Sequence, residues 1–382
     1  MDDAAYREFL DGFVTQARRD LHPIGLRIEE TEHIDNDELF PVLDEMKAWA
    51  LCVPEEDGGL GLTVVQYLPI LFELAKIHNG IRGIVHVHNS MAHALSEMVN
   101  DEQRAMLFPA MASREVSVAG AITEPDHGTG ADVGTTATVD GEEYVLNGRK
   151  HLITNSNFCS HFLVVCKVAD EGAVILCERG AEGLEIEPLP ELMGAKGGEH
   201  GELRFNDVRV PRGNIVGDEG EGIERMAKLL ELSRLLVAAS SLGTAERAME
   251  LATEFSKQRV TFGKPIAQRQ AVQRYLAEMA VDVHALRLMI FDAAEKWDAG
   301  ERIPNEASIA KLYGLEAVGR VTDRSLLVHG GIGYTRKHEI ERLYRDARLN
   351  YLEEGTPTIQ QLVIARGVLG GTFDMDSTAP RA

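Results

Sequence analysis

The segment Asn350-Tyr351-Leu352-Glu353-Glu354-Gly355-Thr356 is the most informative part of this chain. It closes a run that begins with His329-Gly330-Gly331-Ile332-Gly333-Tyr334 and continues through Glu341-Arg342-Leu343-Tyr344-Arg345-Asp346-Ala347-Arg348. Glycines in the first part let the backbone approach a pyrophosphate closely. A carboxylate is a candidate general base wherever a weakly acidic proton must be removed.

The chain has 382 residues, enough for two or three structural domains around a sizeable core. Its 61 acidic and 39 basic residues give a formal charge of -22, which argues against nucleic acid or an anionic membrane as the main partner. No apolar run reaches the roughly 18–20 residues of a membrane span, and the acidic N-terminus lacks a signal-peptide core. We therefore expect a cytoplasmic protein with no integral membrane segment.

The four cysteines are Cys52, Cys159, Cys166 and Cys177. They form no Cys-x-x-Cys pair and no His cluster accompanies them, so the pattern predicts neither a metal site nor a disulfide. Cys166 and Cys177 lie in apolar runs and are expected to be small buried hydrophobes.

The hydrophobic pattern changes twice along the chain. Helical spacing in the first block is clearest for Ile70, Leu71, Leu74 and Ile77 and for Met91, Ala94, Leu95 and Met98. The middle block carries short β-type runs at 143–148, 162–166, 173–176 and 203–205, with turns expected at Asp140-Gly141 and Asn147-Gly148. In the last block, an apolar stripe from Val272 to Leu286 predicts a long helix.

Three further motifs carry candidate binding residues. The loop Ala121-Ile122-Thr123-Glu124-Pro125-Asp126-His127-Gly128-Thr129 offers backbone N–H groups to a planar heteroaromatic edge or a thioester. The second motif is Leu146-Asn147-Gly148-Arg149-Lys150-His151-Leu152-Ile153-Thr154-Asn155. In the third, Arg259-Val260-Thr261-Phe262-Gly263-Lys264-Pro265-Ile266 with Gln270, an Arg fork can hold phosphate and an aromatic ring can pack on adenine.

Taken together, these segments resemble the acyl-CoA dehydrogenases over nearly the whole chain. The resemblance implies an α+β chain with the acyl-CoA dehydrogenase fold. Its parts would be an N-terminal helical domain over 1–115, a middle β-barrel or sandwich domain over 116–222, and a C-terminal four-helix bundle over 223–382. It also implies FAD as cofactor, α,β-dehydrogenation of an acyl-CoA thioester, transfer of electrons to electron-transfer flavoprotein, and a homo-oligomer, expected to be a tetramer.

The same resemblance implies roles for single residues. Glu354 would remove the α-proton while the flavin takes the β-hydride. The residues implied to contact FAD are Ile122, Thr123, Thr129, Ile153, Thr154, Arg259, Phe262, Gln270, Gly330, Gly331 and Thr356. Those implied to contact the substrate are Thr129, Arg234 and Gly355. Arg259, Phe262 and Gln270 would reach the FAD of a neighbouring subunit.

Several positions depart from the family pattern, among them Thr129 for Ser, Gly130 for Asp and Thr358 for Gln or Glu. Leu152 replaces an aromatic that shields the flavin, and Leu327 replaces a Gln that precedes the paired glycines. Glu353 replaces an aromatic residue, usually Tyr. Two adjacent carboxylates in one apolar pocket repel, and one tends to protonate. Glu353 therefore points to solvent or the acyl pocket is more polar than usual, which argues against a plain straight-chain fatty acyl substrate.

Several alternatives stay open from the sequence. One family branch places its base on the helix just before the position of Arg234; Ser233 stands there and cannot serve, which favours Glu354. The enzyme alternatives are an acyl-CoA oxidase, an enoyl-CoA reductase, and an enzyme for a carrier-protein-bound acyl group. A non-catalytic flavin or acyl-CoA binder is disfavoured by Glu354, Thr154 and Arg259, and a flavin monooxygenase by Glu354. Acyl chain length, branching and dimer versus tetramer also stay open.

Overall fold

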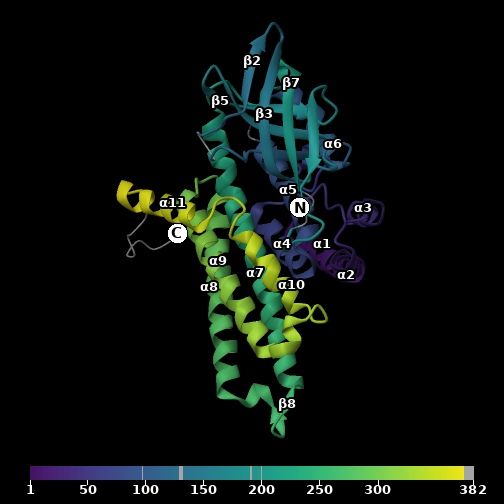
Figure 1. Cartoon of the computed structure of the whole chain (residues 1–382), viewed down its shortest axis with the longest axis vertical. Helices are drawn as coiled ribbons and strands as arrows, with labels where there is room; N and C mark the ends of the chain where they lie inside the picture. Colours follow the sequence, from purple (N-terminus) through teal and green to yellow (C-terminus); the bar gives the residue numbers. More distant parts are fainter. Residues whose placement is uncertain (97, 129–131, 190–191, 199, 374–382) are drawn as a thin grey trace. The chain divides into compact units, whose positions relative to one another are not determined.

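The computed structural model describes residues 1–373 except 97, 129–131, 190–191 and 199. The chain divides into two compact units, Met1–Leu229 and Leu230–Ala382. Unit 1 contains helices followed by strands, and unit 2 is built mainly from long helices (Figure 1). The changes of periodicity in the sequence correspond to the change from α6 to β1 and from β7 to α7. The boundaries at 115/116 and 222/223 remain predictions.

Helices make up the first part of unit 1. They are α1 (Asp3–Gln16), the π-helical turn η1 (Ala17–Leu21), α2 (His22–Thr31), α3 (Asn36–Glu45), the 3-10 turn η2 (Glu55–Asp57), α4 (Val64–Ile77), α5 (Asn79–Ser96) and α6 (Asp101–Ala112). The helical spacing at 70–77 is confirmed by α4, which starts with a reciprocal capping box between Thr63 and Gln66. The spacing at 91–95 falls in α5, whereas Met98 lies beyond the end of that helix.

Strands make up the second part of unit 1. They are β1 (Val118–Ala121), β2 (Thr136–Asp140), β3 (Glu143–Thr154), β4 (His161–Val168), β5 (Glu171–Glu178), β6 (Leu184–Pro188) and β7 (His200–Pro211), followed by the 3-10 turn η3 (Arg212–Asn214). They form one seven-stranded sheet in the order β1-β4-β2-β3-β7-β6, with β5 paired to β4. The β1-β4 and β2-β4 pairs are parallel and the others antiparallel, and the predicted β-type runs lie in β3, β4, β5 and β7.

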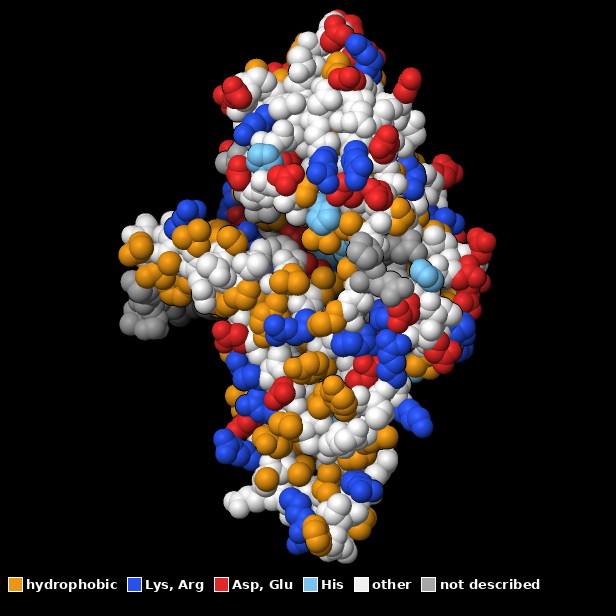
Figure 2. Space-filling model, in the orientation of Figure 1, with side chains coloured by type: hydrophobic (Ala, Val, Ile, Leu, Met, Phe, Trp, Pro, Cys, Tyr) orange, Lys and Arg blue, Asp and Glu red, His pale blue; other side chains and the backbone are white. Residues whose placement is uncertain are grey.

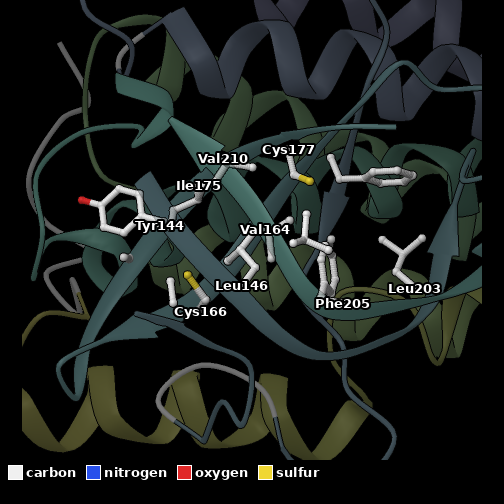
Figure 3. Packing of buried hydrophobic residues seen from close by; sticks show 14 of the residues in the cluster. Tyr144, Leu146, Val164, Cys166, Ile175, Cys177, Leu203, Phe205 and Val210 are labelled. Carbon is white, nitrogen blue, oxygen red and sulfur yellow. The ribbon is translucent and has the colours of Figure 1, made fainter. Parts of the chain in front are cut away.

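The core of this sheet is a cluster of inward-facing side chains (Figure 3). Tyr144 and Leu146 alternate along β3 and meet Phe205 from β7 in the same cluster. Cys166 and Cys177 lie in it as free, fully buried thiols, which confirms the sequence prediction for both. This packed cluster gives the loops at the strand ends a rigid base.

One of the two predicted turns is wrong. Asp140 and Gly141 do close the β2-β3 hairpin, with Gly141 at φ 62. Asn147-Gly148 instead lies inside β3, where the pairing with β7 shifts register between Leu146 and Gly148. The Asn147 side chain binds Asp207 on β7, donating to Oδ1 at 2.9 Å and accepting from the backbone N–H at 3.0 Å. The Asn-Gly pair therefore forms a β-bulge rather than a hairpin turn.

Unit 2 consists of helices and one small hairpin. Its elements are α7 (Gly222–Gln258, which begins in unit 1), β8 (Val260–Thr261), β9 (Lys264–Pro265), the 3-10 turn η4 (Ile266–Gln268), α8 (Gln270–Asp298), α9 (Pro304–His329), the 3-10 turn η5 (Gly330–Tyr334), α10 (Ile340–Asn350) and α11 (Pro357–Gly370). The predicted stripe is confirmed by α8, which buries Met279, Val283 and Leu286. Within this unit α7, α8, α9 and α10 run side by side, with Ser325 of α9 and Asn350 of α10 hydrogen-bonded to α7, and α9 also packs against α11 (Figure 1).

The helices of the described residues are unsuited to spanning a membrane. None of them combines the length and the apolar composition that a crossing requires.

Replacing Gly148 with Ala is expected to destabilise the protein more than replacing Gly141. Both glycines have positive φ, so either alanine costs about 1–2 kcal/mol in backbone strain. At Gly148 a Cβ would also lie 2.6 Å from Thr135 Oγ1, which adds about 1–3 kcal/mol of overpacking, whereas a Cβ at Gly141 has open space. The melting temperatures of the two variants measure the difference; equal shifts would contradict the bulge.

Candidate active site

The site begins with a turn between two helices of unit 2. After α10 ends at Asn350, the chain turns and α11 starts at Pro357, a residue suited to a first helical position. Glu354 has φ 53 and Gly355 has φ 94, so both lie in the left-handed region. Glycine accepts this conformation freely, but for Glu354 it costs about 1–2 kcal/mol. The turn therefore needs contacts that hold it.

Three side chains from different helices hold this turn through its carbonyl oxygens. Nζ of the fully buried Lys311 on α9 donates to the carbonyl oxygens of Glu353 and Gly355. Nε2 of Gln360 on α11 donates to the carbonyl oxygens of Glu354, at 3.1 Å, and Gly355, at 3.0 Å. Nε of Arg234 on α7 donates to the Glu354 carbonyl oxygen at 3.4 Å. We call this set of donors the carbonyl clamp.

The turn leaves one backbone donor available. The N–H groups of Leu352 and Glu353 both donate back to the carbonyl oxygen of Leu349. Within the described part of the chain, the next N–H, that of Glu354, has no hydrogen-bond acceptor. A fixed N–H beside a carboxylate is suited to polarise the carbonyl oxygen of a ligand.

The Glu354 carboxyl group lies in an environment that favours proton uptake. Burial raises its pKa above that of an ordinary carboxyl group, although the residue remains partly accessible. The positive charge of Lys311 opposes this, while adjacent Glu353 raises the pKa further. A hydrogen bond with Ser233 and the charge of Arg234 also oppose the rise. The raised pKa of Glu354 suits a base that must act on a very weak acid.

Two cations face the two adjacent carboxylates. Burial lowers the pKa of Lys311 to about 8, although Glu354 and Glu353 act to raise it. Burial also lowers the pKa of Arg234. Glu231, one turn before Arg234 on α7, is engaged by Nε of Arg302 at 3.1 Å. Lys311 and Arg234 therefore offset the repulsion that the neighbouring glutamates create.

In unit 1, the motif at 146–155 lies beside the described part of the first motif, residues 121–128. The His151 N–H donates to the Thr123 carbonyl oxygen at 2.7 Å, and Lys150 Nζ donates to that of Ile122 at 3.1 Å. Oγ1 of Thr154 lies 3.1 Å from Nε2 of His200, its partner across β3 and β7. The side chain of Ile153 packs in the β core, so only its backbone is available to a ligand. Thr129, also predicted as a site residue, lies outside the described residues.

A buried ion pair supports the first of these loops. Glu124 accepts hydrogen bonds from Lys150 Nζ at 2.7 Å, from Thr135 Oγ1 at 2.6 Å and from the Gly134 N–H at 2.6 Å. Burial alone would raise the pKa of Glu124, but these hydrogen bonds outweigh burial and lower the pKa to about 2. The carboxylate therefore stays ionised and ties the loop to β3.

Five of the predicted residues of unit 2 lie away from Glu354. Arg259, Phe262 and Gln270 gather at the β8-β9 hairpin, at the end of the helices opposite α11 (Figure 1). All three are exposed, and Phe262 reaches 96% exposure at φ 47. Gly330 and Gly331 follow α9 in the turn η5, where a Cβ added to either residue would meet open space.

Thr356 lies at the other end of the unit, beside the turn. It is the N-cap residue of α11, with φ -63 and ψ 167, and its side chain makes no capping hydrogen bond. Thr356 and Gly355 therefore share the Glu354 turn with Arg234, whereas the hairpin and glycine residues do not.

Sequence reasoning missed the clamp residues Lys311 and Gln360. A signal was available for Lys311, because it lies in a stripe of small and apolar buried positions on α9 that includes Ala307, Ala310 and Gly314. A lysine on such a stripe needs a buried partner, since isolated charges are costly to bury. No comparable signal marks Gln360, whose partners are backbone atoms of the turn.

Comparison with known proteins identifies the family. Models of the acyl-CoA dehydrogenase N-terminal, middle and C-terminal domains match residues 3–115, 119–208 and 220–369. The chain belongs to the acyl-CoA dehydrogenase family. An acyl-CoA dehydrogenase of Bacillus subtilis is 33% identical over 366 residues, which cover 93% of this chain and 96% of the relative. The expected fold of three parts and the enzyme class, an oxidoreductase acting on CH–CH bonds, are confirmed.

Two other proteins extend the comparison. The caffeyl-CoA reductase-Etf complex subunit CarC of Acetobacterium woodii is 30% identical, over 92% of this chain and 96% of the relative. The structure of an acyl-CoA dehydrogenase of Bacillus anthracis complexed with FAD is similar at a TM-score of 0.89 and 26% identity, over 97% of this chain and 68% of that one. FAD is accordingly the cofactor of this chain, as expected from the sequence.

Replacing Lys150 with Met is expected to destabilise unit 1 by about 3–5 kcal/mol, because Glu124 then loses its buried cation. Since hydrogen bonding lowers the pKa of Glu124 from 4.5 to about 2, the stabilisation is present above pH 4.5 and is lost as the pH falls toward 2. Thermal unfolding of the FAD-loaded protein measures the effect. Lys167→Met on β4, at a partly exposed site, is the control and should shift stability by less than about 0.5 kcal/mol. Similar shifts in both variants would contradict this account.

Proposed function

We propose that the chain catalyses α,β-dehydrogenation of an acyl-CoA thioester with Glu354 as the general base. The observation that carries this proposal is the Glu354 turn, in which a carboxylate of raised pKa adjoins an N–H without an acceptor among the described residues. The reaction needs both features, because the α-proton of a thioester is very weakly acidic.

Each group of the turn has a chemical task in this proposal. A Glu354 oxygen takes the α-proton as the Cα–H bond breaks, and the carboxyl group becomes neutral. The Glu354 N–H donates to the thioester carbonyl oxygen and stabilises the charge that develops there. Bound FAD supplies the acceptor for the hydride that leaves Cβ. Arg234 and Gly355 border the same turn and are proposed to contact the acyl thioester, together with Thr129 of unit 1.

The assignment of FAD contacts is supported separately in each unit. In unit 1, the neighbouring Thr123 and Thr154 regions offer hydrogen-bonding groups, and we assign Ile122 and Ile153 to backbone contacts. In unit 2, Arg259, Phe262 and Gln270 form an exposed set suited to phosphate and adenine. The unobstructed backbone at Gly330 and Gly331 suits close approach of a pyrophosphate. We further assign Thr356, at the start of α11, to the cofactor.

A buried histidine next to Gly330 also supports the assignment of the paired glycines to the cofactor. Nδ1 of His329, the residue before Gly330, lies 2.7 Å from the Ser325 carbonyl oxygen. Its Nε2 is buried and has no hydrogen-bond partner among the described residues. An unsatisfied buried nitrogen next to an open glycine backbone is typical of a place where a polar ligand completes the contacts.

We propose electron-transfer flavoprotein as the electron partner. Support comes from the resemblance and from the relative whose name includes an Etf complex. The same relative is named a reductase, so the reverse reaction is a second candidate. Proton transfer is reversible, and Glu354 in its neutral form could return a proton to Cα. A 2-enoyl-CoA that reoxidises the reduced flavin faster than any acyl-CoA bleaches it would favour the reductase.

We also propose that the chain forms a homo-oligomer, with a tetramer as the expected form. Figure 2 shows hydrophobic side chains on the surface of the helices of unit 2. The large apolar side chains exposed on helices of this unit include Val281 at 66%, Leu288 at 58% and Leu369 at 88%. Together with Phe262 at 96%, they are the kind of surface that a partner subunit covers. Sedimentation velocity measures the state, and a monomer at micromolar concentration would contradict it.

Replacing Glu354 with Gln is expected to retain FAD but abolish reduction by substrate, because the amide cannot accept the α-proton. An anaerobic visible-absorption titration with straight, branched and polar acyl-CoAs measures this. We expect a member with a polar acyl group to bleach the wild-type flavin, since Glu353 replaces the usual aromatic. Glu316→Gln, an exposed position on α9, is the control and should bleach as wild type does. Bleaching of the Glu354→Gln flavin at the wild-type rate would refute the assignment of the base.

A further inference from the structure

Lys311 is unusual among the charged residues of unit 2. It is fully buried, which lysine rarely is, and it lies on the inner stripe of α9. Its ammonium group donates to the carbonyl oxygens of Glu353 and Gly355, one on each side of Glu354. A buried lysine in this position acts on the neighbouring carboxylate through its hydrogen bonds and its charge, as well as through packing.

We propose that Lys311 is a positioning residue for Glu354, holding its left-handed turn and supplying the charge that keeps its carboxylate ionised beside Glu353. This inference rests on the proposed function, in which Glu354 is the base. It gives a residue of α9, outside the sequence motif around Glu354, a role in proton abstraction.

The geometric part of the inference follows from which carbonyl groups are held. The two peptide planes that flank the Glu354 Cα carry the carbonyl oxygens of Glu353 and Glu354, so holding both oxygens restricts the φ and ψ angles of Glu354. Gln360 contacts the carbonyl oxygens of Glu354 and Gly355, and Arg234 that of Glu354. Lys311 adds the carbonyl oxygen of Glu353, on the N-terminal side. Without Lys311, the carbonyl clamp would hold only the carbonyl oxygens of Glu354 and Gly355.

The electrostatic part follows from the charged groups around the carboxylate. Lys311 faces it from α9, Arg234 from α7, and Glu353 from the same turn. Burial raises the pKa of Glu354, and Lys311 has the largest effect in the opposite direction, ahead of Ser233 and Arg234. A base must be ionised before it takes a proton, so the charge of Lys311 extends activity to lower pH.

The two parts separate experimentally, because different variants remove different properties. Lys311→Met removes the charge and both donors, whereas Lys311→Arg retains the charge with a different shape. Gln360→Leu removes a neutral donor to the same turn and leaves the charges unchanged. Lys337→Met, at an exposed position before α10, is the matched control for losing one lysine.

The measurement is the single-turnover rate of flavin bleaching, followed from acidic to alkaline pH with the acyl-CoA found by titration. For Lys311→Met we expect the limiting rate to fall about 100-fold from misplacement of the base. The acidic limb of the pH–rate profile of this variant should move to higher pH by about one unit, because the charge is lost. Lys311→Arg and Gln360→Leu should lower the limiting rate of bleaching without moving the acidic limb of the pH–rate profile. Lys337→Met should match wild type in both.

Other outcomes overturn the inference. If Lys311→Met has the limiting bleaching rate and the acidic limb of wild type, Lys311 does not position Glu354. A crystal structure of that variant with Glu354 still at positive φ would contradict the geometric part. If Lys311→Met does not fold, a limb that moves upward in Lys311→Arg would contradict the electrostatic part, because this variant keeps the charge.

Controls distinguish this failure from failure of the proposed function. FAD absorbance and the melting temperature of each variant show whether cofactor and fold are retained. If Glu354→Gln bleaches normally, the proposed base is wrong whatever the lysine variants do. If Glu354→Gln is inactive and Lys311→Met behaves as wild type, only the inference about Lys311 fails.

Discussion

The left-handed turn at Glu354 is the constraint on which the site depends. This conformation costs about 1–2 kcal/mol for a residue with a side chain. Each hydrogen bond from a charged donor contributes about 1.5–3 kcal/mol, so the two bonds from Lys311 outweigh that cost. The result is a turn in which a carboxylate adjoins an N–H that has no acceptor among the described residues. A regular helix end would instead use that N–H internally.

Buried lysines perform similar tasks in the two units. In unit 1, Lys150 binds the Ile122 carbonyl oxygen and the Glu124 carboxylate, which ties the loop after β1 to β3. In unit 2, Lys311 binds the backbone on both sides of Glu354. Both lysines are fully buried within well-packed elements. In both units an irregular segment is thus held by a buried lysine from a regular element.

Local patterns in the sequence are sufficient to predict much of the secondary structure. The helical spacing at 70–77 and the stripe on α8 follow from burial of one helix face, and the β-type runs follow from alternation. The turn predicted at Asn147-Gly148 was wrong because a bulge and a turn use the same residues, and the contact of Asn147 with Asp207 is 60 residues distant in sequence. Glu354 was recognisable from its motif, whereas Gln360 was not, because its partners are backbone atoms brought near by folding.

Exchange of the α-proton tests the central claim most directly, because it isolates the step assigned to Glu354 from hydride transfer. The measurement is NMR of an acyl-CoA with no hydrogen on Cβ, incubated in D2O with the FAD-loaded enzyme. The account predicts that wild type replaces the α-protons with deuterium and that Glu354→Gln does not exceed the rate without enzyme. Exchange by Glu354→Gln at the wild-type rate would contradict it and place the base elsewhere.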